Sequence, residues 1–189
     1  MRIILLGLLC ITLMAVTAWW ASSDEPSSPA LSFQDEQGSG LDYYLRDVKT
    51  TSLGPDGQPI RILQAAEIRH LQADGGSQLQ QPSLLMYPDT GPPWRIEAAS
   101  GRLSASGDML MLDGAVQITR AQSPTTAPVQ LDTQHVRIQT RQHYFETDEP
   151  VQIVSAAHRL QATGLQAWLQ TPVKLHFLHA VRGRYVPNE

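Results

Sequence analysis

The amino-acid sequence predicts an all-β domain of short antiparallel strands, and three observations carry this prediction. After residue 42 apolar and polar residues alternate in short runs, turn residues separate these runs, and no long helical period interrupts them. Such alternation is typical of half-buried strands, and short strands at this spacing are typical of a β-sandwich or jelly roll. The sequence therefore favours hairpins that stack around one shared apolar core.

Two of the predicted hairpins resemble one another at a fixed distance along the chain. Residues 94–119 recur without a gap 35 positions later, as residues 129–154. Identities are few, but the apolar positions keep their places, and each copy reads as strand, turn, strand. A fixed-period repeat indicates stacked units that lend their apolar faces to one core. Two ordinary hairpins can also look alike, because alternation and turn residues are common to hairpins.

The N-terminal segment is apolar over a length that can cross a membrane. Residues 3–21 carry no charge, and about 20 apolar residues are needed to span the hydrocarbon core as a helix. The apolar regions of signal peptides are shorter, roughly 7–15 residues, although small residues at 16–18 and 21–23 leave cleavage open. Trp19 and Trp20 stand where an aromatic belt anchors a spanning helix. We expect residues 1–23 to form one uncleaved transmembrane anchor.

Charge sets the orientation of this anchor and the setting of the rest of the chain. Arg2 precedes the apolar run, whereas Asp24 and Glu25 come after it, so the positive-inside rule leaves a short cytoplasmic tip and exports the remainder of the chain. Residues 24–41 are rich in Ser, Pro, Gly, Asp and Glu, which predicts a flexible linker. The exported domain, residues 42–187, has no cysteine and is long enough to bury a core without disulfides.

Each strand of this domain is predicted from its own alternating run. Turn signals such as residues 54–57 and 88–93 separate the runs. The expected strands are 43–51, 60–71, 83–87, the two strands of each repeat copy, 160–170 and 174–185. The run 60–71 is the weakest of them, because residues 64–67 could form a helical turn.

Alternation also assigns the two faces of each strand. In the run 109–119, Leu110, Leu112, Val116 and Ile118 share one side, which is expected to face inward. On pattern alone, inner faces that simply pack together are favoured over an open apolar groove.

No motif for catalysis, metal binding or nucleic-acid binding stands out. His176 and His179 are three positions apart, which on a strand puts the two rings on opposite faces, and no set of further ligands accompanies them. The chain contains no nucleophile elbow and no phosphate-binding glycine loop. Its net charge of −4 and the lack of a basic run argue against nucleic acid. We expect no enzyme, no metal and no cofactor.

The order and spacing of several short motifs, together with the N-terminal apolar segment, resemble the LptC family, the inner-membrane-anchored component of the lipopolysaccharide export machinery. The motifs extend over nearly the whole chain. They are Tyr43-Tyr44-Leu45, Gly57 before Ile60, Gln81-Pro82-Ser83-Leu84, Trp94-x-Ile96-x-Ala98, Leu103, Leu110-x-Leu112-x-Gly114-x-Val116, Asp148-x-Pro150-Val151 and Gly164-Leu165.

The resemblance implies a twisted antiparallel β-jelly roll whose open apolar groove holds lipopolysaccharide acyl chains. It implies transfer of the lipid from the inner-membrane ABC transporter to LptA, the periplasmic bridge protein. Residues 174–185 would dock LptA, and residues 43–51 would meet the periplasmic domain of the transporter. A membrane-anchored adaptor that assembles an envelope complex without binding lipid is the alternative.

Both the alternation and the resemblance lead to a set of expected site residues. The inward side chains expected to line the groove are Ile96, Leu112, Val116, Ile118, Val136, Ile138, Val151, Ile153, Leu175 and Phe177. The residues expected at the partner-docking edges are Tyr44, Gly164 and Val181. Gly164 is included because glycine inside a strand pattern marks a bulge, a bend or a close backbone approach.

Overall fold

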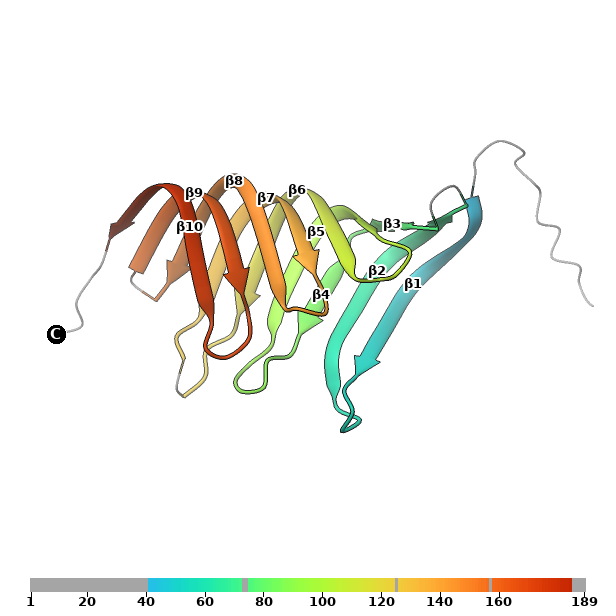
Figure 1. The fold of residues 1–189 in the computed structure, drawn as a ribbon, viewed down its shortest axis with the longest axis horizontal. Coiled ribbons are helices and arrows are strands. Elements are labelled where there is room, and N and C mark those ends of the chain that lie inside the picture. The colour runs from blue at the N-terminus through green and yellow to red at the C-terminus, as the bar shows by residue number, and fades with distance from the viewer. Residues whose placement is uncertain (1–40, 73–74, 125, 157, 185–189) are drawn as a thin grey trace, which may run out of the picture. The chain divides into compact units, whose positions relative to one another are not determined.

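The computed structural model describes residues 41–72, 75–124, 126–156 and 158–184, and the strands of this part of the chain pair only antiparallel (Figure 1). The predicted anchor, residues 185–187 and the linker apart from Leu41 lie outside the described residues. Within the described ranges no helix is long and apolar enough to cross a membrane. The strands are β1 (Leu41–Leu53), β2 (Pro59–Leu71), β3 (Ser77–Gln80), β4 (Ser83–Met86), β5 (Trp94–Leu103), β6 (Met109–Arg120), β7 (Val129–Gln139), β8 (Tyr144–Ser155), β9 (His158–Trp168) and β10 (Lys174–Arg184).

All ten strands belong to one sheet in the order β1-β2-β3-β5-β6-β7-β8-β9-β10, with β4 also between β2 and β5. β3 and β4 therefore act as two halves of one interrupted strand, separated by Gln81, which has a φ of 49°, and Pro82. The sequence predicted only the second half, because β3 is four residues long and has Leu79 as its one apolar side chain. Residues 64–67 lie in β2, so the helical turn considered there does not form.

Bends near the middle of the strands turn this sheet into a jelly roll. Gly114 on β6 and Gly164 on β9 have φ angles of 73° and 77°, and Asp47, His135 and Ala180 adopt positive φ on β1, β7 and β10. The pairing register shifts at several of these places, as expected for bulges, which bend a strand and increase its twist. Figure 1 shows the result as successive arches that stack beside one another from β5 to β10.

The core lies on the inner face of these arches. Eight of the ten residues predicted to face inward are buried, from Ile118 and Ile138 at 0% exposure to Ile153 at 8%. The alternating neighbours Arg95, Gln117 and Gln152 are exposed on the outer face. The inward alternation predicted for β5 to β8 is therefore confirmed, and the bulges do not reverse it.

The repeat seen in the sequence is a repeat of structure. β6 and β8 have bounds that are 35 residues apart at both ends, and β5 and β7 begin 35 residues apart. The register shift between Leu112 and Ala115 on β6 corresponds, 35 residues later, to the shift between Thr147 and Pro150 on β8. Each copy is one bent hairpin, so the predicted reading of strand, turn and strand is confirmed.

Candidate functional site

A pocket of about 420 Å³ with a mainly apolar surface opens at the β10 end of the domain. Its volume lies within the range of about 300–1,000 Å³ that is typical of small-molecule sites. It is lined by Ile153, Ser155, His158, Arg159, Leu160, Leu175, Phe177, Gly183 and Arg184, from β8, β9 and β10. Three of the residues predicted to line a groove, Ile153, Leu175 and Phe177, therefore come together here.

The pocket lies beside β10, which is the end strand of the described sheet. Leu175 pairs with Ala167 and Phe177 pairs with Leu165, and both partners on β9 are completely buried. Leu175 and Phe177 thus share the inner face, but no further strand of the described sheet covers them. Leu175 is 40% exposed and Phe177 is half-buried. The prediction of their inward direction agrees with the register, whereas Leu175 is not enclosed, because it stands at an open end.

The interior is closed away from this end. Ile96, Leu112, Val116, Ile118, Val136, Ile138 and Val151 are at most 2% exposed. These side chains belong to a single buried cluster, in which the two halves of the folded sheet pack against each other. In this structure the apolar inner face is accessible at the pocket beside β10, called the mouth from here on. The central part of the inner face is filled by side chains.

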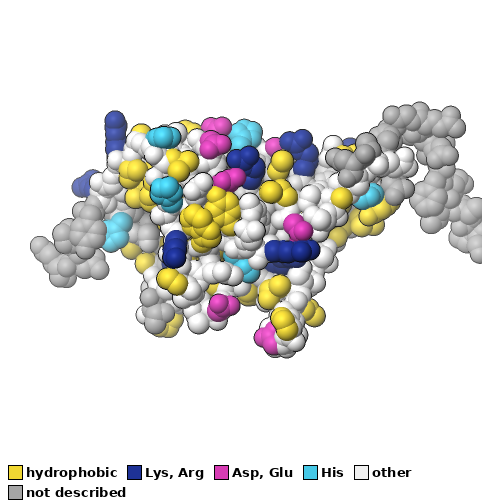
Figure 2. Space-filling view, in the orientation of Figure 1, with side chains coloured by type: hydrophobic (Ala, Val, Ile, Leu, Met, Phe, Trp, Pro, Cys, Tyr) yellow, Lys and Arg dark blue, Asp and Glu magenta, His cyan; other side chains and the backbone are white. Residues whose placement is uncertain are grey.

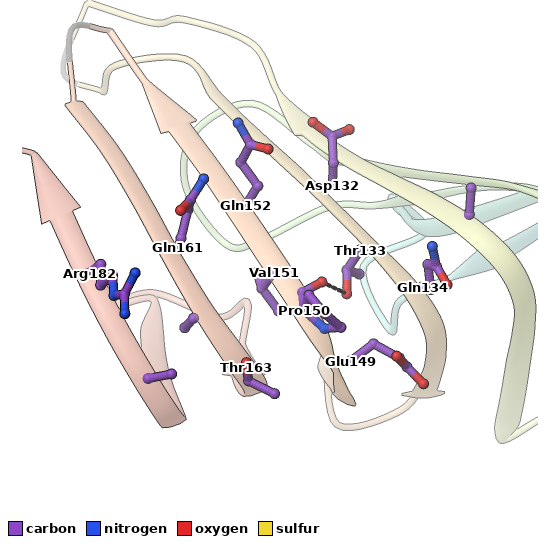
Figure 3. Close-up of a pocket in the computed structure, with 13 residues that line it drawn as sticks. Asp132, Thr133, Gln134, Glu149, Pro150, Val151, Gln152, Gln161, Thr163 and Arg182 are labelled. Atoms are coloured by element: carbon purple, nitrogen blue, oxygen red, sulfur yellow. Dashed lines mark hydrogen bonds between the residues drawn. The ribbon is translucent and has the colours of Figure 1, made fainter.

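A second, larger pocket of about 860 Å³ lies across the bends of β6 to β10 and has a mixed polar and apolar lining. Figure 3 shows Asp132, Gln152 and Gln161 extending from neighbouring strands on the same side. Thr133 donates a hydrogen bond of 3.0 Å from its hydroxyl to the carbonyl oxygen of Pro150, which joins the bends of β7 and β8. Its walls carry amides and carboxylates beside apolar side chains such as Val151 and Ala162, so this outer pocket is less apolar than the pocket beside β10.

The three residues expected at docking edges occupy different positions. Tyr44 on β1 and Val181 on β10 are 61% and 54% exposed, and their strands are the two ends of the described sheet. Gly164 lies one strand inside the edge, on β9. A Cβ atom at Gly164 would lie 2.8 Å from Cδ1 of Leu178 on β10. Any effect of Gly164 on docking therefore acts through the position of β10.

Two ionisable groups near the turns of β7 and β8 have displaced pKa values. Burial, and then the hydrogen bond of 2.7 Å that the Tyr144 hydroxyl donates to Glu146, raise the pKa of Tyr144 to about 12. Burial lowers the pKa of His143, and the Asp89 carboxylate opposes this shift. In the part of the chain that the structure describes, no three His, Cys, Asp or Glu side chains gather in a way that could hold a metal ion.

Sequence reasoning missed Leu160, Arg159 and Arg184, which also line the mouth. Leu160 could have been predicted, because it lies two positions before the buried Ala162 on β9 and therefore shares its face of the strand. The two arginines could not, because their proximity arises from the pairing of β9 with β10, in which Arg184 is opposite Arg159.

Comparison with solved structures supports the assignment of the fold. The chain is similar to LptH from Pseudomonas aeruginosa, described as the LptA-homologous periplasmic component of the conserved lipopolysaccharide transport device. The TM-score is 0.54 at 8% sequence identity, over 67% of this chain and 95% of that chain. The likeness shows that the described domain has the LptA-like β-jelly-roll fold.

Comparison of sequences supports the family. No curated protein sequence matches the chain. The family described as "Lipopolysaccharide-assembly, LptC-related" matches residues 7–186, which is nearly the whole length. Together with the open-ended jelly roll, this match shows that the chain belongs to the LptC family.

Proposed function

We propose that this protein binds lipopolysaccharide and transfers it from the inner-membrane ABC transporter to an LptA-like periplasmic bridge protein. Residues 1–23 anchor the chain in the inner membrane, and the jelly roll lies in the periplasm. The β1 edge faces the transporter and the β10 edge faces the bridge protein. This role requires no catalytic residue in the chain.

The observation that carries the proposal is the apolar mouth beside β10. Ile153, Leu160, Leu175 and Phe177 offer an apolar surface to a ligand that arrives at the end of the domain. Each CH₂ group removed from water contributes about 0.8 kcal/mol, so several methylenes in this mouth suffice to hold part of an acyl chain. The mouth adjoins the edge strand where a second jelly roll would add its own strand by β-augmentation. A lipid held there is next to the partner that receives it.

The closed central core supports the alternative function, that of a membrane-anchored adaptor that binds no lipid. Side chains such as Ile118 and Ile138 have no exposed surface, and an adaptor that joins two envelope proteins needs no deeper groove. Under the proposed function, the two halves of the sheet separate when lipid passes through. Under the alternative, they stay packed while lipid is carried by other proteins.

Photo-crosslinking in cells separates the two functions. A benzoylphenylalanine residue is placed at Phe177 in the mouth, at Val116 in the centre, or at the outward Gln152 as a matched control. Lipid transfer predicts capture of lipopolysaccharide at Phe177 and, during active transport, at Val116, with none at Gln152. An adaptor predicts crosslinks to partner proteins alone. Absence of lipid at Phe177 in a functional chain contradicts the proposal.

A further inference from the structure

The β9–β10 hairpin has a charge composition unlike that of the rest of the chain. The chain has 14 Lys and Arg residues against 18 Asp and Glu residues, yet residues 150–188 contain no Asp or Glu at all. Within this stretch, β9 and β10 carry Arg159, Lys174, Arg182 and Arg184, together with His158, His176 and His179. Figure 2 shows dark blue and cyan side chains without magenta at this end of the face in view.

Pairing register places the basic residues of β10 on the side of the strand opposite Leu175 and Phe177, and Arg184, next to Gly183, also borders the mouth. Lys174 is opposite Trp168, His176 is opposite Gln166, Arg182 is opposite Gln161, and Arg184 is opposite Arg159. All four of these β10 side chains are exposed. No carboxylate stands opposite any of them on β9, and one position sets two arginines against each other. Like charges directly opposite one another on neighbouring strands are destabilising.

Two arginines elsewhere on the outer face have carboxylate partners on neighbouring strands. Arg137 on β7 lies 3.1 Å from Glu146 on β8, and Arg102 on β5 lies 3.7 Å from Asp113 on β6. Opposite charges in such cross-strand pairs stabilise a sheet and favour one register. β10 carries basic side chains at such positions, but β9 offers them no carboxylate partner.

We infer that β10 docks the edge strand of a different protein whose outward residues are acidic at alternate positions. This inference rests on the proposed function, since it specifies the chemistry of the partner that the β10 edge receives. The outer backbone groups of β10 have no partner strand in the described sheet, so an incoming strand gains hydrogen bonds. Its alternate carboxylates then face Lys174, Arg182 and Arg184.

The same charges disfavour a second copy of this chain as the occupant. Two β10 strands placed together would set cations against cations. The β1 strand carries Asp42 and Asp47 but also Arg46 and Lys49, so it has no acidic row to offer. An anionic lipid surface would neutralise the cations, but it would leave the backbone groups of the edge strand without partners. A separate acidic strand satisfies both the charges and the backbone.

Binding of two designed peptides tests the inference on the full-length chain in detergent. One peptide of about eleven residues alternates Val with Glu, and the other alternates Val with Gln. At low salt the Glu peptide should bind about tenfold more tightly, from three cross-strand charge pairs. The preference should shrink at 0.5 M salt, where the Debye length falls to roughly 4 Å. Equal affinity for the two peptides at low salt overturns the inference.

Variants assign the preference to the basic residues of β10. The triple change Lys174→Gln, Arg182→Gln and Arg184→Gln should abolish the preference, whereas Arg95→Gln, Arg102→Gln and Arg137→Gln on β5 and β7 should keep it. A Glu preference that survives the β10 triple change overturns the inference. Arg182→Glu should weaken binding of the Glu peptide and strengthen binding of a peptide that alternates Val with Lys. Misfolding cannot explain a gain in binding of the second peptide.

Two parallel measurements distinguish an acidic strand from a lipid surface and from the acyl-chain site. If the β10 triple change removes binding to anionic phospholipid vesicles while both peptides bind wild type equally, the basic residues of β10 serve a lipid surface and the inference is wrong. Lipid capture at Phe177 is scored on the same proteins. If the chain with the photo-crosslinker at Phe177 and no other change captures no lipid, the proposed function is wrong. The preference for the Glu peptide tests separately whether the partner strand is acidic.

Discussion

Gly164 occupies the bend of β9 in a conformation that other residues rarely adopt. Its φ is 77°, and an added Cβ would meet both Cδ1 and Cβ of Leu178, at 2.8 and 3.0 Å. The left-handed conformation alone costs a residue with a side chain roughly 1–2 kcal/mol. Gly164→Ala should therefore lower the free energy of unfolding by more than this amount, because β10 must also shift. Urea unfolding of the domain measures the loss.

Gly114 offers a matched control for this prediction. It lies at the bend of β6 with a φ of 73°, but a Cβ there meets nothing within 4 Å. Gly114→Ala should show only the backbone cost, so the difference between the two variants isolates the contact with Leu178. The larger Gly164→Arg should also reduce binding to the bridge protein more than binding to the transporter. Equal losses for both partners would make Gly164 a structural residue without a role in docking.

Tyr144 predicts how the stability of the domain depends on alkaline pH. Its folded-state pKa is raised from 10.0 to about 12, first by burial and then by Glu146. Above pH 10 the unfolded chain releases this proton while the folded chain keeps it. The stabilisation from Tyr144 is therefore complete below pH 10 and is lost as the pH rises toward 12. The stability difference between wild type and Tyr144→Phe should shrink over this interval in urea titrations, and a constant difference would refute the assignment.

At the scale of the strand, the alternation was predictable and the bends were not. Apolar residues at every second position identified the inner face of β5 to β8, because burial on one face imposes that period. The bends at Asp47, His135 and Ala180 gave no sequence signal, since these residues are not glycine and their positive φ angles are stabilised by the surrounding sheet. Without the bends, the sequence could not distinguish a sandwich from a folded single sheet.

The effect of an introduced charge on folding and on lipid capture should depend on its position along β6 and β8. Val116 on β6 is 2% exposed in the closed centre, whereas Ile153 on β8 lies beside the mouth. Val116→Arg should unfold the domain, because burying an unpaired ion costs several kcal/mol. Ile153→Arg should fold, because its guanidinium group can reach water through the mouth, and it should block lipid capture at Phe177.

Circular dichroism and lipid crosslinking on the same samples check this pair of outcomes. Gln152→Arg, which adds the same charge one residue away on the outer face, serves as the control and should keep both fold and capture. A folded Ile153→Arg protein that captures lipid normally would exclude the mouth as the acyl-chain site.

At the scale of the whole chain, the proposed function gives the apolar segment 3–21 the role of a membrane anchor. Under the proposed function it stays attached, since its length suits a membrane span better than a signal peptide. Mass spectrometry of the mature protein from membranes should therefore find the N-terminal residues present. A mature N-terminus near Trp19 or Asp24 would contradict the anchor.

The candidate site was only partly accessible from the sequence. The inward residues of the pocket, Leu175 and Phe177, follow from alternation, but their exposure depends on β10 being the last strand of the described sheet. Likewise, the acid-free stretch from 150 to 188 is visible in the sequence, whereas its meaning requires the register that places the basic residues of β10 on one side of the strand. The local sequence pattern thus predicts which way a side chain points, whereas its exposure depends on the neighbouring strands.

The 35-residue hairpin unit has a consequence for the evolution of this fold. β5 and β7 begin at matching positions, and β6 and β8 have matching bounds and matching register shifts, so the second unit repeats the bent hairpin of the first. Duplication of one unit would lengthen the domain by two strand spacings, roughly 10 Å, while both end strands keep their sequences. Under the proposed function, the distance that the domain spans between its two partners would therefore depend on the number of units, and it could change while both end strands stay the same.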